Sequence, residues 1–169
     1  MALAAIKLMA RASATPCLDV SMFIEAPAGL VFKAFFEPHA LGAWWQVVRS
    51  VTTPRVLGPY AIEWAPTEFR DEILGRLGGT FRGTVLQIEP GVSFFVGDAY
   101  WLPPDGEPIG PMALDVALTE GSGSHGRSGT LIRVMQRGYE DSARWRRYYD
   151  VVAVGWERAL SSLRMLLEK

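Results

Sequence analysis

The stretch DSARWRRYYDVVAVGWERALSSLRMLLE, residues 141–168, decides the fold class of this chain. Its apolar side chains recur three or four residues apart, which is the spacing of one face of an α-helix. These positions are Trp145, Tyr149, Val152, Trp156, Leu160, Leu163 and Leu167. Asp141 or Ser142 fits the N-cap, because a short side chain with an oxygen accepts a hydrogen bond from the first helical turn. The pattern predicts a long amphipathic helix with one face on a sheet, and it turns Arg147 and Tyr148 away from that face.

Upstream of this helix, residues 17–137 alternate apolar and polar side chains in short runs that are typical of strands. The expected strands are residues 18–24, 47–52, 60–64, 79–88, 92–101, 112–118 and 130–137. Turns such as residues 89–91 are too short for the crossover that parallel pairing needs. Two short helices, one after Pro27 and one from Pro38 to Trp45, separate the first two strands. We therefore expect an α+β helix-grip fold, in which a curved antiparallel sheet of about six to seven strands and the long helix enclose an apolar cavity.

The order of these elements and several short motifs resemble the START-like, or SRPBCC, superfamily, which has the Bet v 1-like helix-grip fold. The motifs are IEAP (24–27), VFKAF (31–35), LGAWW (41–45), GTVLQIEP (83–90), GT (129–130) and GW (155–156). Within the superfamily, the group related to the heat-shock-ATPase activator is the most similar, and the resemblance covers residues 17–169. It implies a deep pocket between sheet and helix, which different members use for lipids, sterols, polyketides or plant hormones. Some members are cyclases and others act on chaperones, and the resemblance transfers no catalytic residue.

Strand alternation and helical spacing predict which side chains line this pocket. The predicted ligand-binding residues are Tyr60, Trp64, Phe94, Leu114, Gln136, Tyr149 and Val152. Wide aromatic rings would supply most of the contact area for an apolar ligand, and Gln136 would fix its polar end. The parity of residues 79–88 is ambiguous, so Phe81 is an undecided candidate.

Several kinds of partner and site do not fit this sequence. The 17 Lys and Arg residues nearly balance the 18 Asp and Glu residues, so no nucleic-acid partner is expected. His39 and His125 lack the paired spacing of a metal site, and no catalytic residue, metal or other cofactor is predicted. The GSGSHG stretch at 121–126 precedes a strand instead of opening a helix, so it predicts a hairpin loop and not a nucleotide site. Cys17 is expected to be a small buried side chain.

The sequence predicts a flexible N-terminal tail over residues 1–16 and a single domain over residues 17–169. Lys7 interrupts the apolar run near the N-terminus, so no signal peptide is expected, and no apolar run reaches the length of a membrane span. The chain has one cysteine and no asparagine, hence no acceptor for N-glycosylation. These features favour a cytoplasmic location.

The predicted function is binding of a small hydrophobic or amphipathic molecule without catalysis. One alternative is a cyclase or hydrolase that acts on an apolar, polyketide-like substrate, for which Asp98 or Tyr100 would have to face inward. The other is a protein-interaction module of the chaperone-activator kind, which would show an exposed apolar patch. A homodimer and a contact with a chaperone remain open, because no motif points to either.

Overall fold

The computed structural model describes residues 17–138 and 140–169, so the predicted tail, residues 1–16, lies outside the described part of the chain. The helices are α2 (Ala28–Ala34), α3 (Pro38–Trp45) and α4 (Ala143–Leu167). The strands are β1 (Cys17–Ile24), β2 (Arg49–Thr52), β3 (Pro59–Trp64), β4 (Arg70–Asp71), β5 (Gly75–Arg76), β6 (Gly79–Glu89), β7 (Ser93–Leu102), β8 (Ile109–Ser122) and β9 (Ser128–Gly138).

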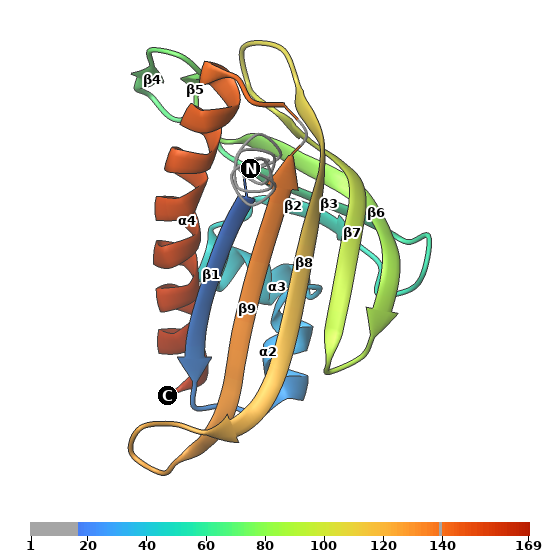
Figure 1. The fold of residues 1–169 in the computed structure, drawn as a ribbon, viewed down its shortest axis with the longest axis vertical. Helices are drawn as coiled ribbons and strands as arrows, with labels where there is room; N and C mark the ends of the chain where they lie inside the picture. The colour runs from blue at the N-terminus through green and yellow to red at the C-terminus, as the bar shows by residue number, and fades with distance from the viewer. Residues whose placement is uncertain (1–16, 139) are drawn as a thin grey trace, which may run out of the picture.

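One strongly curved sheet holds seven of these strands in the order β1-β9-β8-β7-β6-β3-β2, and every neighbouring pair is antiparallel (Figure 1). Alternation decides which face each side chain occupies. In β9, Ile132, Val134 and Gln136 are buried, whereas Arg133 and Arg137 are exposed. The α+β helix-grip fold expected from the sequence is confirmed.

The long helix α4 runs beside the β1 edge of the sheet and contacts both β1 and α3 (Figure 1). Its N-cap is Ser142, whose Oγ accepts a hydrogen bond of 3.2 Å from the backbone N–H of Trp145. Trp156, Leu160 and Leu163 are buried against the rest of the protein, as the apolar stripe predicts.

The two short helices cover one end of the concave face with an aromatic cluster, formed by Phe32, Phe35, Phe36, Trp44, Tyr60 and Phe94. The Phe94 ring lies 4.9 Å from that of Phe36 and 5.5 Å from that of Phe35, measured between centroids. Tyr60 Oη donates a hydrogen bond of 2.9 Å to the carbonyl of Phe35. The cluster therefore fills this end with packed rings.

A β-bulge in β7 changes which residues of that strand face inward. The pairing of β7 with β8 shifts register between Val96 and Ala99, and Asp98 adopts a positive φ of 48°. Beyond the shift, Ala99 and Trp101 are buried, while Asp98 is exposed and Tyr100 is half-buried. The bulge thus carries Trp101 to the concave side of the sheet.

Three local predictions have clear outcomes. Residues 121–126 cover the end of β8 and most of the turn that leads to β9 in an antiparallel hairpin, as expected. The burial expected for Cys17 is wrong, because this residue begins the edge strand β1 and is exposed. Within the described residues, no helix is both long enough and apolar enough to cross a membrane.

Candidate ligand cavity

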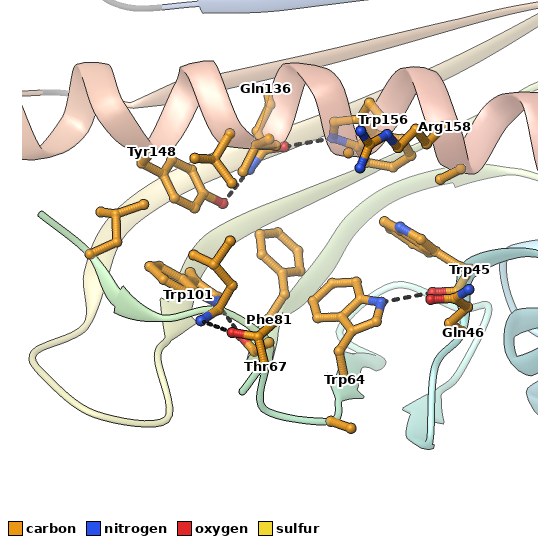
Figure 2. A pocket seen from close by; sticks show the side chains of 18 of the residues that line it. Trp45, Gln46, Trp64, Thr67, Phe81, Trp101, Gln136, Tyr148, Trp156 and Arg158 are labelled. Atoms are coloured by element: carbon orange, nitrogen blue, oxygen red, sulfur yellow. Dashed lines mark hydrogen bonds between the residues drawn. The ribbon is translucent and has the colours of Figure 1, made fainter. Parts of the chain in front are cut away.

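A cavity of about 510 Å³ lies between the concave face of the sheet and α4 (Figure 2). Its volume is within the range of small-molecule sites, which is roughly 300 to 1,000 Å³. Seven of its 21 described lining residues are aromatic, namely Trp44, Trp45, Trp64, Phe81, Trp101, Tyr148 and Trp156. Apolar area of this kind favours contact with an apolar ligand.

A buried hydrogen-bond network crosses from β9 to α4 at the cavity wall (Figure 2). Gln136 Nε2 donates to Tyr148 Oη at 2.8 Å, and Trp156 Nε1 donates to Gln136 Oε1 at 3.0 Å. Tyr148 Oη also lies 3.4 Å from the sulfur of Met112. The amide thus joins sheet to helix, and its oxygen and nitrogen are both satisfied within the protein.

Tyr148 is a neutral hydrogen-bonding group in this network. Burial raises the pKa of its phenol, and the hydrogen bond from Gln136 offsets only part of that increase. The hydroxyl stays protonated across the physiological pH range. It therefore cannot act there as a phenolate base.

Trp44, Trp64 and Trp101 of the wall are held in place by hydrogen bonds to backbone carbonyls. Trp64 Nε1 donates to the carbonyl of Trp45 at 3.0 Å, and Trp101 Nε1 donates to the carbonyl of Gly78 at 2.7 Å. The rings of Trp45 and Trp156 pack with a centroid separation of 4.6 Å, which brings α3 against α4. These contacts form a fixed aromatic surface in which the N–H groups of Trp64 and Trp101 are already used.

The mouth of the cavity is marked by its exposed lining residues, which are Gln46, Ala65, Gly155, Arg158 and Ser162. They come from the end of α3, the segment after β3 and one edge of α4. Arg158 is the single charged side chain among the described lining residues. The wall is therefore apolar in its depth and polar at its mouth.

The small hairpin of β4 and β5 covers one end of the cavity. Its residue Leu74 is buried and lines the cavity wall. An ion pair fastens this hairpin to α4: Asp71 Oδ2 accepts hydrogen bonds from Arg147 Nε at 2.8 Å and Arg147 Nη2 at 2.5 Å. Asp71 Oδ1 accepts from the backbone N–H groups of Ile73 and Leu74, each at 3.0 Å. The hydrogen bond from Arg147 is the main reason that the pKa of Asp71 falls to about 2.

The structure places four of the seven predicted site residues in the cavity wall: Trp64, Leu114, Gln136 and Val152. Tyr60 and Phe94 face the concave side as expected, but they belong to the aromatic cluster under α2 and α3 and do not line the cavity. Tyr149 does not line it either, because its ring stacks on Trp145 with a centroid separation of 6.1 Å.

The prediction that Tyr148 points away from the core is wrong. Its side chain is buried, with its ring 5.5 Å from that of Trp101. Tyr148 and Tyr149 are both buried although they are about 100° apart around the helix, so the covered arc of α4 is wider than a single stripe. The sequence did contain a signal for this wider buried arc, because the first turns of α4 are rich in aromatic side chains.

Other lining residues could not be predicted from the sequence, for different structural reasons. Trp101 reaches the cavity through the bulge in β7, which simple alternation does not predict. Leu74 and Leu77 belong to a segment, residues 65–78, that has no regular alternation. The undecided Phe81 is buried and lines the cavity. Neither Asp98 nor Tyr100 belongs to the lining.

Comparison with known families adds independent information. Residues 25–168 match the family described as Activator of Hsp90 ATPase homolog 1-like protein. The chain belongs to this family. Membership in the Activator of Hsp90 ATPase homolog 1-like family confirms the START-like resemblance and its closer grouping with the heat-shock-ATPase activator homologues. None of the curated protein sequences compared with the chain matches it.

Solved structures similar to this member of the Activator of Hsp90 ATPase homolog 1-like family have the same fold. A Mesorhizobium loti protein is 22% identical with a TM-score of 0.62, and the match covers 90% of this chain and 97% of that one. A Rhodobacter sphaeroides protein is 19% identical with a TM-score of 0.68, covering 92% and 93% of the two chains. The Aha1 dimer from Colwellia psychrerythraea, solved in solution, is 16% identical with a TM-score of 0.60, covering 90% and 96%. At these identities the likeness shows the fold alone.

Proposed function

We propose that the protein binds a small hydrophobic or amphipathic molecule in the cavity between its sheet and α4, without chemical conversion. The observation that supports this most is the composition of the wall, which is rich in aromatic side chains and has its buried polar groups paired within the protein. Such a surface favours an apolar ligand, since a ligand needing many hydrogen bonds would find few free partners in it.

The alternative of a cyclase or hydrolase has less support. General acid–base or nucleophilic chemistry needs a titratable group or an activated nucleophile within reach of the substrate. The described lining includes no Asp, Glu, His, Lys or Cys, and Tyr148 is a protonated phenol. Asp98 is exposed on the other side of the bulge in β7. Binding is therefore the better proposal.

Gly155 offers a direct test of the binding proposal. A Cβ atom added there would meet no atom within 4 Å, and the residue lies at the mouth on α4. Gly155→Phe should therefore put a ring into the opening without disturbing the fold, and it also removes a residue that weakens helices. We expect the neutral fluorescent probe Nile red to bind the natural protein with a blue-shifted emission and to bind this variant at least about tenfold more weakly.

The matched control is Val154→Phe. Val154 is the preceding residue of α4, is 47% exposed and does not line the cavity. This variant should bind Nile red as the natural protein does. Equal binding by Gly155→Phe and Val154→Phe would place the probe on the outer surface and count against the cavity as a binding site.

A contact with a chaperone is a second candidate function, supported by the description of the family. Exposed apolar side chains also lie close together in the sequence: Val48 directly precedes β2, Val51 lies on it, and Val56 and Leu57 lie in the turn after it. The test is the ATPase rate of a purified Hsp90-class chaperone with the protein added. The function would be supported if the natural protein and Gly155→Phe both raise the ATPase rate and Val51→Asp does not. If the natural protein does not raise the ATPase rate, the function is rejected.

The location and the assembly state also belong to this proposal. The single cysteine and the absence of asparagine support a cytoplasmic location. The Aha1 dimer of Colwellia psychrerythraea supports testing for a homodimer. Light scattering of the purified protein at several concentrations would decide between monomer and dimer.

A further inference from the structure

The charge of the cavity wall is one-sided. The described residues that line it include no carboxylate, and their single cation is Arg158. Arg158 lies on the edge of α4 that also carries Val151, Gly155 and Ser162, three or four residues apart and all part of the lining. Figure 2 shows Arg158 and Trp156 on the side of α4 that faces the cavity.

Arg158 also lacks an acidic partner in the described part of the chain. The ion pairs there involve the arginines at positions 49, 70, 127, 133, 146 and 147. A guanidinium beside a wall of low polarity attracts an anion more strongly than one surrounded by water. Its planar set of N–H donors matches the two oxygens of a carboxylate.

The depth of the cavity does not suit a polar group. Gln136, Tyr148 and Trp156 are bonded to one another, and Trp101 is bonded to a backbone carbonyl. A ligand group that needed hydrogen bonds at this depth would have to break these pairs or remain unpaired, and either is unfavourable. The polar end of a ligand therefore belongs at the mouth, where Gln46, Arg158 and Ser162 are exposed.

We propose that the ligand is a single-chain amphiphile with a carboxylate at its polar end. The hydrocarbon part lies among the rings of the cavity, and the carboxylate accepts hydrogen bonds from Arg158 at the mouth. One cation balances one negative charge, which favours a carboxylate over a phosphate monoester that carries about two. This inference rests on the proposed function and adds the chemical class of the ligand.

The test compares two probes with the same chain length, dodecanoate and dodecanol, as competitors of bound Nile red. We expect dodecanoate to bind about 2- to 5-fold more tightly than dodecanol at low ionic strength, and we expect added salt to reduce this preference. Arg158→Met should abolish the preference, because the affinity for dodecanoate should fall to that for dodecanol. Arg158→Lys should keep part of it, because the charge remains and the planar donor set does not.

Arg164→Met is the matched control, since Arg164 is an exposed cation of α4 that does not line the cavity. It should retain the preference for dodecanoate. Equal affinity for the two probes in the natural protein, or a preference that survives in Arg158→Met, would overturn the inference and leave the proposed function standing. If neither Nile red nor dodecanol binds, the proposed function fails and the inference fails with it.

Discussion

At the scale of single residues, Gln136 determines how sheet and helix meet across the cavity. Its amide has a partner from α4 on both its nitrogen and its oxygen, namely Tyr148 and Trp156. A leucine of similar size would keep the shape of the wall but would leave the N–H of Trp156 without an acceptor. Leaving a buried donor unpaired costs about 1 to 3 kcal/mol.

We therefore expect Gln136→Leu to lower the free energy of unfolding by about 1 to 3 kcal/mol, measured by urea denaturation. Gln87→Leu, on the exposed side of β6, is the control and should change it by less than about 0.5 kcal/mol. The double variant Gln136→Leu/Trp156→Phe no longer has the unpaired indole N–H. Its loss of unfolding free energy should therefore be smaller than the sum of the losses in the two single variants. Strict additivity would show that the two side chains are not coupled.

Trp64 carries a second prediction at this scale. It is half-buried, lines the cavity and is fixed by its hydrogen bond to the carbonyl of Trp45. Trp64→Ala should weaken the binding of Nile red by about 1 to 3 kcal/mol, the value of losing a large apolar contact, and should leave a cooperative thermal transition. Phe69→Ala removes a ring that is 63% exposed and outside the cavity, and it should not change the affinity. Equal affinities for all three proteins would contradict the assignment of Trp64.

At the scale of elements, periodic segments could be predicted from sequence and irregular ones could not. The stripe of α4 and the alternation of β9 follow from how a regular backbone presents its side chains. The bulge in β7 breaks that rule, because one additional residue reverses the parity beyond it and brings Trp101 inside. Tyr60 lies outside the cavity because α2 and α3 cover its end of the concave face. The packing of these two short helices fills that end with side chains, and it could not be predicted from the sequence.

The β4–β5 hairpin shows how one ion pair can attach an irregular element. Asp71→Asn keeps the Oδ1 acceptor that supports the turn but removes the charge that binds Arg147. We expect faster hydrogen exchange over residues 66–78 and faster release of Nile red, with little change elsewhere. Asp19→Asn breaks a more exposed ion pair with Arg133, between β1 and β9, and should change neither measurement. Unchanged exchange in Asp71→Asn would mean that apolar contacts alone hold the hairpin.

Acid should loosen the same hairpin in the natural protein. The pKa of Asp71 is about 2 in the folded protein and has an ordinary value of 3.8, so its ionised form favours the folded state. This contribution is complete above about pH 5 and is lost as the pH falls from about 4 through 2. Hydrogen exchange over residues 66–78 should therefore rise in this window in the natural protein more than in Asp71→Asn. Parallel profiles for the two proteins would assign the acid effect to other groups.

At the scale of the whole molecule, the cavity results from the way one curved sheet is covered. The aromatic cluster under α2 and α3 fills one end of the concave face, and α4 spans the rest at a distance that its side chains do not fill. The presence of such a space was expected from the fold class. Its exact lining was not, because it depends on the bulge, on the hairpin and on the wide buried arc of α4.

A ligand in this position contacts the sheet, α3 and α4 together, so it should stabilise the molecule as a unit. A ligand that binds only the folded state stabilises it by about 2.7 kcal/mol at a concentration one hundred times its Kd. For a chain of this size, each kcal/mol raises Tm by roughly 2 to 4 °C, so saturating Nile red or dodecanoate should raise Tm by about 5 to 11 °C. Calorimetry measures this shift, and Gly155→Phe should show little of it at the same ligand concentration. A probe whose fluorescence reports binding while Tm stays constant would be associating with the folded and unfolded chains alike, and the cavity would not be its site.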